Sequence, residues 1–319
     1  MMDNSLKYFL VVAEELNISK AAKKLYISPQ CLSKHIKRLE EKYQVLLFQR
    51  KPNFILTNEG IALVKALRKI QIIENSLKSK FKDIKDGYEG MIKIGIHNTR
   101  ARGLMPKIYP RFYNKYPKVK MYVYNGIVAD SEQLVIKGDL DFFVGPYPKP
   151  SKELKTILLK EEKIYFVVPD NMLSEYFPDI YPQCKLNFKN GINLTDFKNI
   201  PLVMNNNTSN MVPSINNFMK SNNIEPNKVF QTNSNDINLE ISALGYGVCF
   251  CPEMMLDILY ETSILNNKGM HLNVFPILDF NYTNHIVIAY HKDAYLPKYA
   301  LDCIDIIKDI FYNYKPKII

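Results

Sequence analysis

The chain has 319 residues, of which 47% are hydrophobic and 23% are charged, and its formal net charge is +10. This length gives room for two or three compact units, and the hydrophobic content is enough for each of them to bury a core. No apolar run approaches the length of a membrane span, and the N-terminus opens on an amphipathic helix. We therefore expect a cytoplasmic protein without membrane contact.

The five cysteines are odd in number and stand mostly in apolar surroundings, which is typical of reduced core residues. Cys249 and Cys251 are separated by a single residue, so they lack the CxxC spacing of a zinc or thioredoxin site. We expect neither a metal nor any other cofactor. A redox-sensing role for one of the thiols is the minor alternative.

Positive charge is concentrated in the first quarter of the chain. Residues 1–87 hold 17 Lys and Arg against 9 Asp and Glu, a net of +8, whereas the other 232 residues have a net of only +2. A basic module joined to a nearly neutral body is typical of proteins that bind nucleic acid. The alternative is a basic surface that contacts only water. This alternative does not explain why the excess positive charge is confined to residues 1–87.

Apolar residues at helical spacing predict a first helix from about Leu6 to Leu16. Ser19 is expected to cap a short second helix, in which Ala21 and Ala22 allow close packing against a neighbour. A tight turn then leads into a third helix. The predicted order is helix, helix, turn, helix, which is that of a DNA-binding helix-turn-helix.

The third helix carries the strongest functional signal. Ser28 is a favoured N-cap, and Pro29 suits the first helical position because its missing N–H costs nothing there. Apolar residues at helical spacing form one stripe, namely Leu32, Ile36, Leu39 and Tyr43. The opposite face is polar and cationic, as contacts to base edges and phosphates require. The expected DNA-contacting residues of this helix are Ser28, Pro29, Gln30, Ser33, Lys34, Lys37 and Arg38.

Two short apolar runs follow, at 45–48 and 54–56, with a basic and turn-prone stretch between them. They predict a β-hairpin, a wing able to touch the DNA backbone that flanks the recognised bases. Arg50 and Lys51 are its expected phosphate contacts. Residues 1–58 should therefore form a winged helix-turn-helix domain that binds a duplex DNA operator.

Residues 58–85 predict one helix about 40 Å long, and Gly87 and Gly90 mark a hinge after it. Its apolar residues recur near a heptad and lie outside either globular unit, so they need a partner surface. We expect the linker, residues 59–87, to pair two chains into a homodimer. Packing on its own domain is the alternative. The seam consists of Leu63, Leu67, Ile70, Ile73, Leu77, Phe81 and Ile84.

Beyond the hinge, strands alternate with helices, which predicts a parallel sheet in an α/β domain. The first strands are expected at 91–96, 119–124 and 140–144. A second set of elements begins at residue 163, and a strand at 285–290 with the helix after it should return to the first unit.

We therefore expect residues 91–319 to form two lobes. Lobe I comprises about 91–162 and 268–319, and lobe II about 163–267. Residues 169–195, rich in Asn, Tyr and Pro, suggest no function.

Six short motifs occur along the chain: Ala21-Ala22, Ser28-Pro-Gln-Cys-Leu-Ser33, Leu39-Glu40, Leu47-Phe-Gln-Arg50, Leu56-Thr-Asn-Glu-Gly60 and Gly245-Tyr-Gly-Val-Cys-Phe-Cys-Pro252. With these motifs the chain resembles the LysR-type transcriptional regulators of bacteria over nearly its full length. The signature of that family combines an Ala-Ala pair, a Ser-Gln-Pro-Ala-Leu-Ser helix start, a Leu-Glu pair, Leu-Phe-x-Arg and Leu-Thr-x-x-Gly, and a Gly-x-Gly-Val segment that ends in Pro follows in the body.

The chain departs from this signature at two places. Gln and Pro stand in swapped order, so Gln30 lies one position later than the family's Gln and is expected to address a different base. Tyr43 and Gln44 replace a Leu-Gly pair. Helices often end with a residue in the left-handed conformation, which is less favourable for Gln44 than for glycine.

The resemblance implies an effector domain of the type II periplasmic-binding-protein fold after the winged helix-turn-helix and the linker helix. It implies a sequence-specific transcriptional regulator modulated by a small-molecule effector, with dimers that pair again into homotetramers. RNA polymerase is a further candidate partner. An architectural DNA-binding protein without an effector and a solute-binding module are the alternatives.

No enzymatic activity is expected. The sequence contains no Gly-rich phosphate loop, HExxH or Gly-x-Ser-x-Gly motif, and its five histidines are scattered.

Ligands of such folds bind at the carboxyl ends of strands, in the crevice between the lobes. Thr99 aligns with a Ser or Thr that many family members use on the effector. Its hydroxyl, the free amides of the helix start and two nearby arginines predict an anionic effector. Ordinary capping and turn roles are the alternative for these residues. The candidates are Asn98, Thr99, Arg100, Arg102, Ile127, Pro146, Asn205, Asn207, Thr208 and Asn235.

Overall fold

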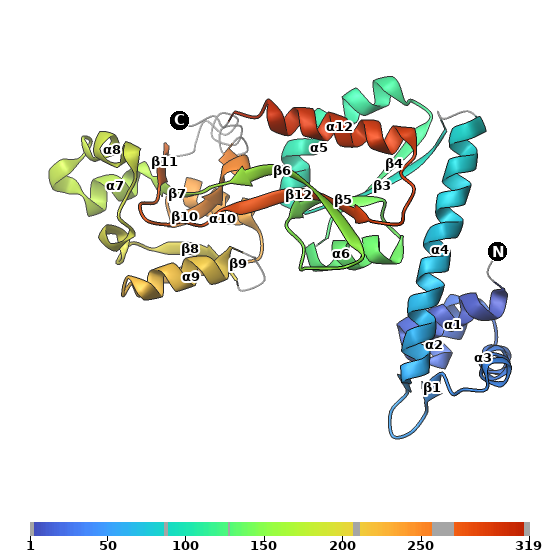
Figure 1. Cartoon of the computed structure of the whole chain (residues 1–319). Coiled ribbons are helices and arrows are strands. Elements are labelled where there is room, and N and C mark those ends of the chain that lie inside the picture. The colour runs from blue at the N-terminus through green and yellow to red at the C-terminus, as the bar shows by residue number, and fades with distance from the viewer. Residues whose placement is uncertain (1–2, 86–88, 127, 207–210, 257–270, 316–319) are drawn as a thin grey trace.

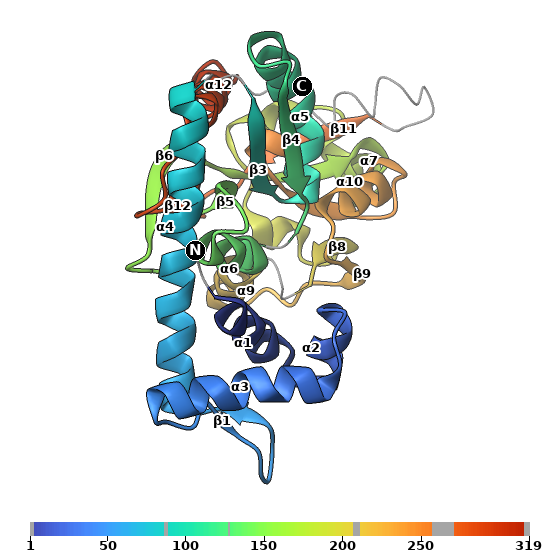
Figure 2. The ribbon, with the colours of Figure 1, turned by 90° about the vertical axis from the view of Figure 1, so that its right-hand side faces the viewer.

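The structure is a computed structural model, and it describes residues 3–85, 89–126, 128–206, 211–256 and 271–315. A long helix, α4, stands between a small N-terminal domain and a larger body with two five-stranded sheets (Figure 1). Figure 2, turned by 90°, shows the N-terminal helices at the lower end of α4 and the first sheet of the body beside its upper part. This architecture agrees with the fold class that the sequence predicted.

The N-terminal domain packs three helices and a two-stranded hairpin around one small core. Leu32, Ile36 and Leu39 are buried on the inner face of α3, as their spacing predicted. Phe9 and Phe48 join the first helix to the hairpin, with their ring centroids 5.4 Å apart. The elements are α1 (Asn4–Glu15), α2 (Ile18–Lys24), α3 (Pro29–Tyr43), β1 (Phe48–Gln49) and β2 (Ile55–Leu56), and the two strands pair antiparallel.

Two details of this domain differ from the prediction. Asn17 caps α2 in place of Ser19, because the Asn17 side-chain oxygen accepts a hydrogen bond from the Lys20 backbone N–H at 2.9 Å. Tyr43 does not belong to the buried stripe of α3, since 44% of its surface is exposed. The buried residue near this end of the helix is Glu40, whose carboxylate accepts hydrogen bonds from backbone N–H groups at the start of the hairpin.

The residue that ends α3 has an unfavourable backbone conformation. Gln44 is left-handed, with a φ of 53°, which costs about 1 kcal/mol for a residue that carries a Cβ. We expect Gln44→Gly to stabilise the N-terminal domain by about 1 kcal/mol, seen as a higher melting temperature. Lys42→Gly, inside the helix, is the control and should destabilise the domain by a similar amount. A lower melting temperature for Gln44→Gly would contradict this account of the helix end.

Helix α4 (Asn58–Lys85) has the bounds that the sequence predicted, and part of it packs on its own chain. Leu67 is only 2% exposed because it belongs to the core of the N-terminal domain. Ile72 is buried against the body, where a Cβ added at Gly138 would lie 3.0 Å from its side chain. The Ser76 hydroxyl accepts a hydrogen bond from the Tyr295 backbone N–H at 2.9 Å. The linker is therefore held by both the N-terminal domain and the body.

These contacts exclude the N-terminal end of the expected seam from the dimer interface. Leu67 is not available to a second chain, and Leu63 is half-buried against the same core. Four residues of the expected seam remain open, and we call them the α4 seam: Ile70, Ile73, Leu77 and Phe81, which are 42%, 60%, 49% and 61% exposed. The side chain of Ile84 lies outside the described residues. None of the described helices is both long enough and apolar enough to cross a membrane.

The first sheet of the body has the strand order β4–β3–β5–β12–β6. Strand β3 is parallel to β4 and β5, as predicted, whereas β12 is antiparallel to β5 and β6. Helices α5 and α12 lie on one side of this sheet and α6 on the other (Figure 1). The bounds are β3 (Gly90–Ile96), α5 (Asn98–Lys115), β4 (Val119–Tyr124), α6 (Val128–Lys137), β5 (Phe142–Pro146), β6 (Leu154–Glu162), β12 (Asn284–His291) and α12 (Lys298–Tyr312).

The second sheet has the order β11–β7–β10–β8–β9. Because β11 pairs antiparallel with β7, the chain is still in the second lobe at Pro276. The return to the first lobe predicted at residue 268 is therefore too early, and it lies between β11 and β12. The bounds are β7 (Ile164–Pro169), β8 (Leu202–Asn205), α9 (Val212–Ser221), β9 (Lys228–Thr232), α10 (Asn235–Ala243), β10 (Val248–Pro252), η4 (Glu253–Met255) and β11 (Leu272–Pro276).

The segment after β7 is an ordered cap on the second sheet. Phe177, Phe188 and Phe197 form a ring cluster with centroids 5.0 to 5.5 Å apart. Phe188 also meets Phe275 of β11 at 5.6 Å, so the cap covers apolar surface at this edge of the sheet. The cap consists of α7 (Asp170–Tyr176), η1 (Pro178–Ile180), α8 (Cys184–Asn187), η2 (Phe188–Asn190) and η3 (Leu194–Phe197).

Candidate nucleic-acid interface and effector site

The start of α3 is built as the sequence predicted. The Ser28 hydroxyl accepts a hydrogen bond from the Cys31 backbone N–H at 3.2 Å, and Pro29 occupies the first turn. These two residues fix where the helix begins, and so which side chains face outward. Pro29 has no N–H, and the Leu32 N–H donates to the Ser28 backbone oxygen at 3.1 Å, so the backbone N–H of Gln30 is the first-turn amide that suits a phosphate oxygen.

The outward face of α3 carries donors along its whole length. Gln30, Lys34, Lys37 and Arg38 are exposed, and Ser33 is half-buried between them. The Lys37 ammonium lies 3.6 Å from the Glu41 carboxylate, but both side chains are largely exposed. This pair is weak in water, so Lys37 can exchange it for a phosphate. The helix thus brings five of the predicted contact residues onto one face, namely Gln30, Ser33, Lys34, Lys37 and Arg38.

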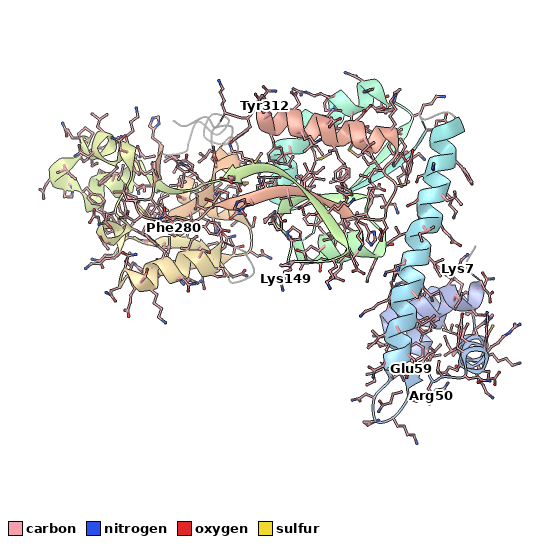
Figure 3. All side chains as sticks on the ribbon, viewed as in Figure 1. Lys7, Arg50, Glu59, Lys149, Phe280 and Tyr312 are labelled. Carbon is pink, nitrogen blue, oxygen red and sulfur yellow. The ribbon has the colours of Figure 1, made fainter. Side chains whose placement is uncertain are left out.

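Glu40 connects α3 to the wing, a role that the sequence did not reveal. Its carboxylate accepts a hydrogen bond from the Leu47 backbone N–H at 2.9 Å and lies 3.4 Å from the Arg50 guanidinium. The Arg50 side chain remains 61% exposed, and Figure 3 labels it at the N-terminal domain. Glu40 therefore orients the Arg50 guanidinium, while most of the Arg50 side chain stays accessible to a phosphate. The neighbouring Lys51 is also exposed. The Leu-Glu pair of the signature was the only hint in the sequence.

The thiols divide into one exposed group and four buried ones. Cys31 is exposed on α3, whereas the other cysteines are buried. Burial raises the pKa of Cys249 and of Cys303 to about 12, and it also raises the pKa of Cys251. A thiol must ionise before it reacts, so these three are unreactive at neutral pH.

The start of α5 is the expected anion site of the body. The helix begins at Asn98 after His97, whose side chain makes no capping hydrogen bond. Burial, and then the nearby positive charge of Arg100, lower the pKa of His97, so this imidazole is neutral at neutral pH. The backbone amides of the first turn of α5 are the part of this expected site that the structure describes, and amides at such a position suit an anion. The side chains of Asn98 and Thr99 lie outside the described residues, as do Ile127, Asn207 and Thr208.

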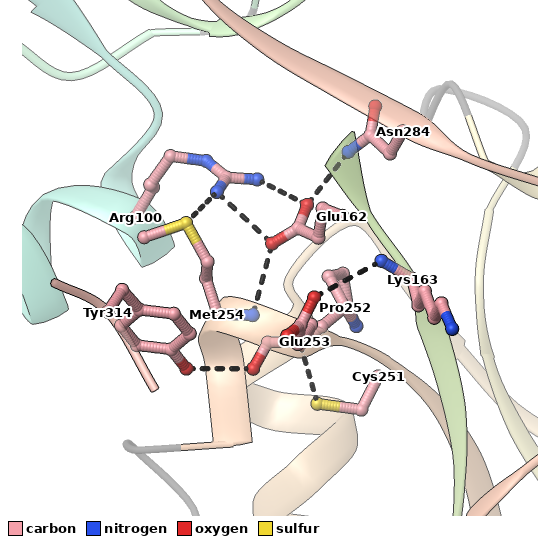
Figure 4. Close-up of polar contacts among 9 residues, drawn as sticks. All are labelled: Arg100, Glu162, Lys163, Cys251, Pro252, Glu253, Met254, Asn284 and Tyr314. Carbon is pink, nitrogen blue, oxygen red and sulfur yellow. Dashed lines mark hydrogen bonds and ion pairs between the residues drawn. The ribbon is translucent and has the colours of Figure 1, made fainter. Parts of the chain in front are cut away.

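Arg100 was expected to offer its charge to an anionic effector, but it is already paired with a carboxylate. Its guanidinium is 9% exposed and donates to both carboxylate oxygens of Glu162, at 3.3 and 3.1 Å (Figure 4). The pair is 62 positions apart in the sequence, so no local pattern could reveal it. Arg102 is 57% exposed and lies 3.9 Å from the Glu240 carboxylate of α10, so its charge is more accessible.

Two of the predicted effector residues of the second lobe are asparagines that the structure describes. Asn205, at the end of β8, is buried and accepts a hydrogen bond from the Asn238 side chain at 2.9 Å. Asn235, in the first turn of α10, has a buried side-chain oxygen that finds no hydrogen-bond partner within the described part of the chain. Pro146 ends β5 in the first lobe and is half-buried. Asn205, Asn235 and Pro146 are uncharged, so among the described candidates only the two arginines could offer charge to an effector.

A groove of about 820 Å³ lies at the edge of the first sheet, between α5 and β4. Among the predicted effector residues whose side chains the structure describes, only Arg102 lines it. Its wall is largely apolar, whereas Arg102, Asn125 and Asp236 supply polar groups. Among the apolar residues are Met105, Pro106, Tyr109, Met121 and Val123.

Comparison with known families assigns both parts of the chain. Residues 4–61 match the family described as bacterial regulatory helix-turn-helix protein, lysR family, and residues 85–311 match the LysR substrate binding domain. A probable RuBisCO transcriptional regulator of Thalassiosira pseudonana is 28% identical over 316 residues, which is 97% of this chain and 94% of that protein. The HTH-type transcriptional regulator CysL of Bacillus subtilis is 25% identical over 278 residues, 85% of this chain and 87% of that protein.

Solved structures agree on the fold. A full-length OxyR variant from Pseudomonas aeruginosa has a TM-score of 0.66 at 19% identity and covers 98% of this chain and 97% of its own. Full-length CbnR in complex with its target DNA has a TM-score of 0.58 at 16% identity and covers 97% of this chain and 99% of its own. The chain belongs to the LysR family of transcriptional regulators, with a DNA-binding helix-turn-helix domain followed by an effector-binding domain.

Proposed function

We propose that this regulator places α3 in the major groove of its operator and rests the β1–β2 wing on the flanking backbone. The observation that carries this assignment is the outward face of α3, where Gln30, Lys34, Lys37 and Arg38 are exposed together. Lysine and arginine contacts to phosphates supply affinity, and Gln30 and Ser33 supply the contacts to base edges. Members of the family are regulators and not enzymes, and RNA polymerase is the partner through which such binding would change transcription. This activity requires the compartment that holds the DNA, which we take to be the cytoplasm.

Binding through phosphates can be tested by its dependence on salt. Lys37→Ala should weaken binding to all sequences similarly and should flatten the plot of log affinity against log salt by about one unit for each Lys37 in the complex. Fluorescence anisotropy over a series of KCl concentrations measures the slope. Lys220→Ala, on the exposed surface of α9, removes the same charge far from α3 and should leave the slope unchanged. An unchanged slope for Lys37→Ala would remove this lysine from the interface.

The regulator should act as a dimer through the α4 seam. Its four residues recur at spacings of three and four, and each leaves at least 42% of its surface uncovered. Pairing two such helices buries this surface and presents two copies of α3 to a nearly palindromic site.

We propose that dimers pair again through their bodies into tetramers. Strand β4 is an edge of the first sheet, and the groove beside it is mostly apolar. Strand β9 is an edge of the second sheet, and its residues are largely exposed. Edges of this kind offer unpaired backbone groups and apolar surface to a second copy.

We also propose a small anionic effector between the lobes, at the first turn of α5. The free backbone amides favour an anion, and Arg102 is the accessible cation. Arg100 is charged but already paired with Glu162, so the amides have the larger role. The uncharged Asn205 and Asn235 would approach the rest of the ligand from the second lobe.

A thermal-shift screen of carboxylates, amino acids, phosphates and neutral sugars tests this site. Carboxylates should raise the melting temperature of the wild-type protein, and the rise should disappear in Thr99→Val. Thr156→Val, in β6, is the matched control and should keep it. Equal shifts in both variants, or hits only among neutral compounds, would exclude the anion site. A ligand that leaves the DNA footprint unchanged would favour an architectural protein without an effector.

A further inference from the structure

The two lobes are joined by a buried carboxylate at the point where the chain first crosses between them. Glu162 ends β6 and is 0% exposed. Besides Arg100 of α5, it accepts hydrogen bonds from the Met254 backbone N–H at 3.1 Å and from the Asn284 side chain at 2.9 Å (Figure 4). Asn284 begins β12, directly after the second crossing. One carboxylate thus holds both crossings, α5 of the first lobe, and η4, which follows β10 of the second lobe.

A second set of contacts holds η4 against the first lobe. The Lys160 ammonium of β6 lies 2.9 Å from the Glu253 carboxylate and 4.5 Å from the centre of the Tyr314 ring. The Tyr314 hydroxyl donates to the Glu253 backbone oxygen at 3.0 Å. Met254 is 7% exposed and packs in the core of the first lobe, where its sulfur accepts from Arg100 at 3.4 Å. The end of β10 is therefore fastened to the first lobe by charge, hydrogen bonds and packing together.

These contacts restrict how the lobes can turn. A guanidinium that donates to both oxygens of a carboxylate fixes its direction as well as its distance. Separating the two charges inside the protein leaves each without a partner, which is strongly unfavourable. Lobe rotation about the crossings must therefore move Arg100, Glu162 and η4 together or break the pair.

We infer that Glu162 is a positioning residue that sets the angle between the lobes and, through Arg100, holds the first turn of α5. The consequence for regulation rests on the proposed function. An effector at the start of α5 binds within the same helical turn as Arg100, so its binding energy acts directly on the Arg100–Glu162 pair. We call the lobes locked while this pair is intact and released when it is broken. A ligand changes a conformation only through different affinity for two states, and here the two states are the locked and the released lobes.

The test measures the distance between the lobes without DNA or effector, so it does not depend on the proposed function. Spin labels are placed at Lys308→Cys in α12 and Lys189→Cys in η2, both exposed positions, in a Cys31→Ser background. The remaining cysteines are buried. Labelled protein is diluted with unlabelled protein so that only distances within one chain are recorded by double electron–electron resonance.

Glu162→Gln should broaden the distance distribution and lower the melting temperature by about 10 °C, because Arg100 keeps an unpaired buried charge. The double variant Arg100→Met with Glu162→Gln removes both charges. It should recover most of the melting temperature, and its distance distribution should remain broad because the directional restraint is absent. Arg111→Met, which breaks the exposed Arg111–Asp309 pair within the first lobe, is the control and should leave the distribution narrow.

The outcomes separate a positioning role from a purely stabilising one. A double variant that folds and has a distribution as narrow as the wild type would overturn the inference. If Glu162→Gln does not fold, the double variant and Asn284→Ala, which removes one hydrogen bond to Glu162, carry the test. Asn284→Ala should broaden the distribution less than the double variant, and a wild-type width in both would again overturn the inference.

Discussion

Replacing Leu77 by Asp should separate the dimer and reduce operator affinity by about 10²- to 10⁴-fold. Leu77 lies in the middle of the α4 seam and is 49% exposed in the single chain. In a symmetric dimer the substitution places two carboxylates near each other in an apolar contact, where neither has a counter-charge. A lone chain holds only one copy of α3, so it loses the gain from binding two half-sites at once.

Sedimentation velocity and fluorescence anisotropy measure the two effects separately. Asn75→Asp is the matched control, since it introduces the same charge on α4 about 160° away from Leu77. The control should sediment as the wild type does and keep its affinity. Leu67 is unsuitable for this test because it lies in the core of the N-terminal domain. A Leu77→Asp protein that remains dimeric and binds normally would place the dimer interface elsewhere.

Replacing Gln30 by Ala should alter sequence preference at one base position in each half-site. A bidentate contact between a side chain and a base contributes about 1–3 kcal/mol of discrimination, or about 5- to 150-fold, and a dimer loses it twice. Gln30 is exposed in the first turn of α3, where helices of this kind approach base edges. Because glutamine is uncharged, the dependence of binding on salt should stay as in the wild type.

A library of operators with every single-base change gives the pattern of this loss. The variant should become indifferent at one position of each half-site and retain its preference at the others. Gln133→Ala, exposed on α6, is the control and should match the wild type throughout. A uniform loss over all positions would assign Gln30 to the backbone and not to a base.

Local patterns predicted the N-terminal domain and the linker helix well, and the exceptions depend on tertiary contacts. Ser19 and Asn17 are both good capping residues within two positions, and sequence preference alone could not choose between them. Tyr43 continued the apolar spacing of α3, but Glu40 is the residue that the backbone of the wing buries. Leu67 fitted the heptad of α4, yet the core of the N-terminal domain reaches that far along the helix.

The body was predictable as an alternation of strands and helices, but its site was not. Strand β11 reads like any other apolar run, and only its pairing with β7 assigns it to the second lobe. Arg100 follows the first strand closely and looked like part of an anion receptor. Its partner Glu162 stands at the crossing between the lobes, and contacts over such a separation leave no local signal in a single sequence.

Hydroxyl-radical footprinting with methylation interference, on the DNA upstream of the regulator's own gene, tests the central claim most directly. Two copies of α3 in successive major grooves predict two protected blocks on one face of the duplex, about one helical turn or a whole number of turns apart. Methylation of guanine N7, which lies in the major groove, should block binding within both blocks, and Leu77→Asp should abolish the paired pattern. Continuous protection without periodicity, or interference confined to the minor groove, would contradict the placement of α3.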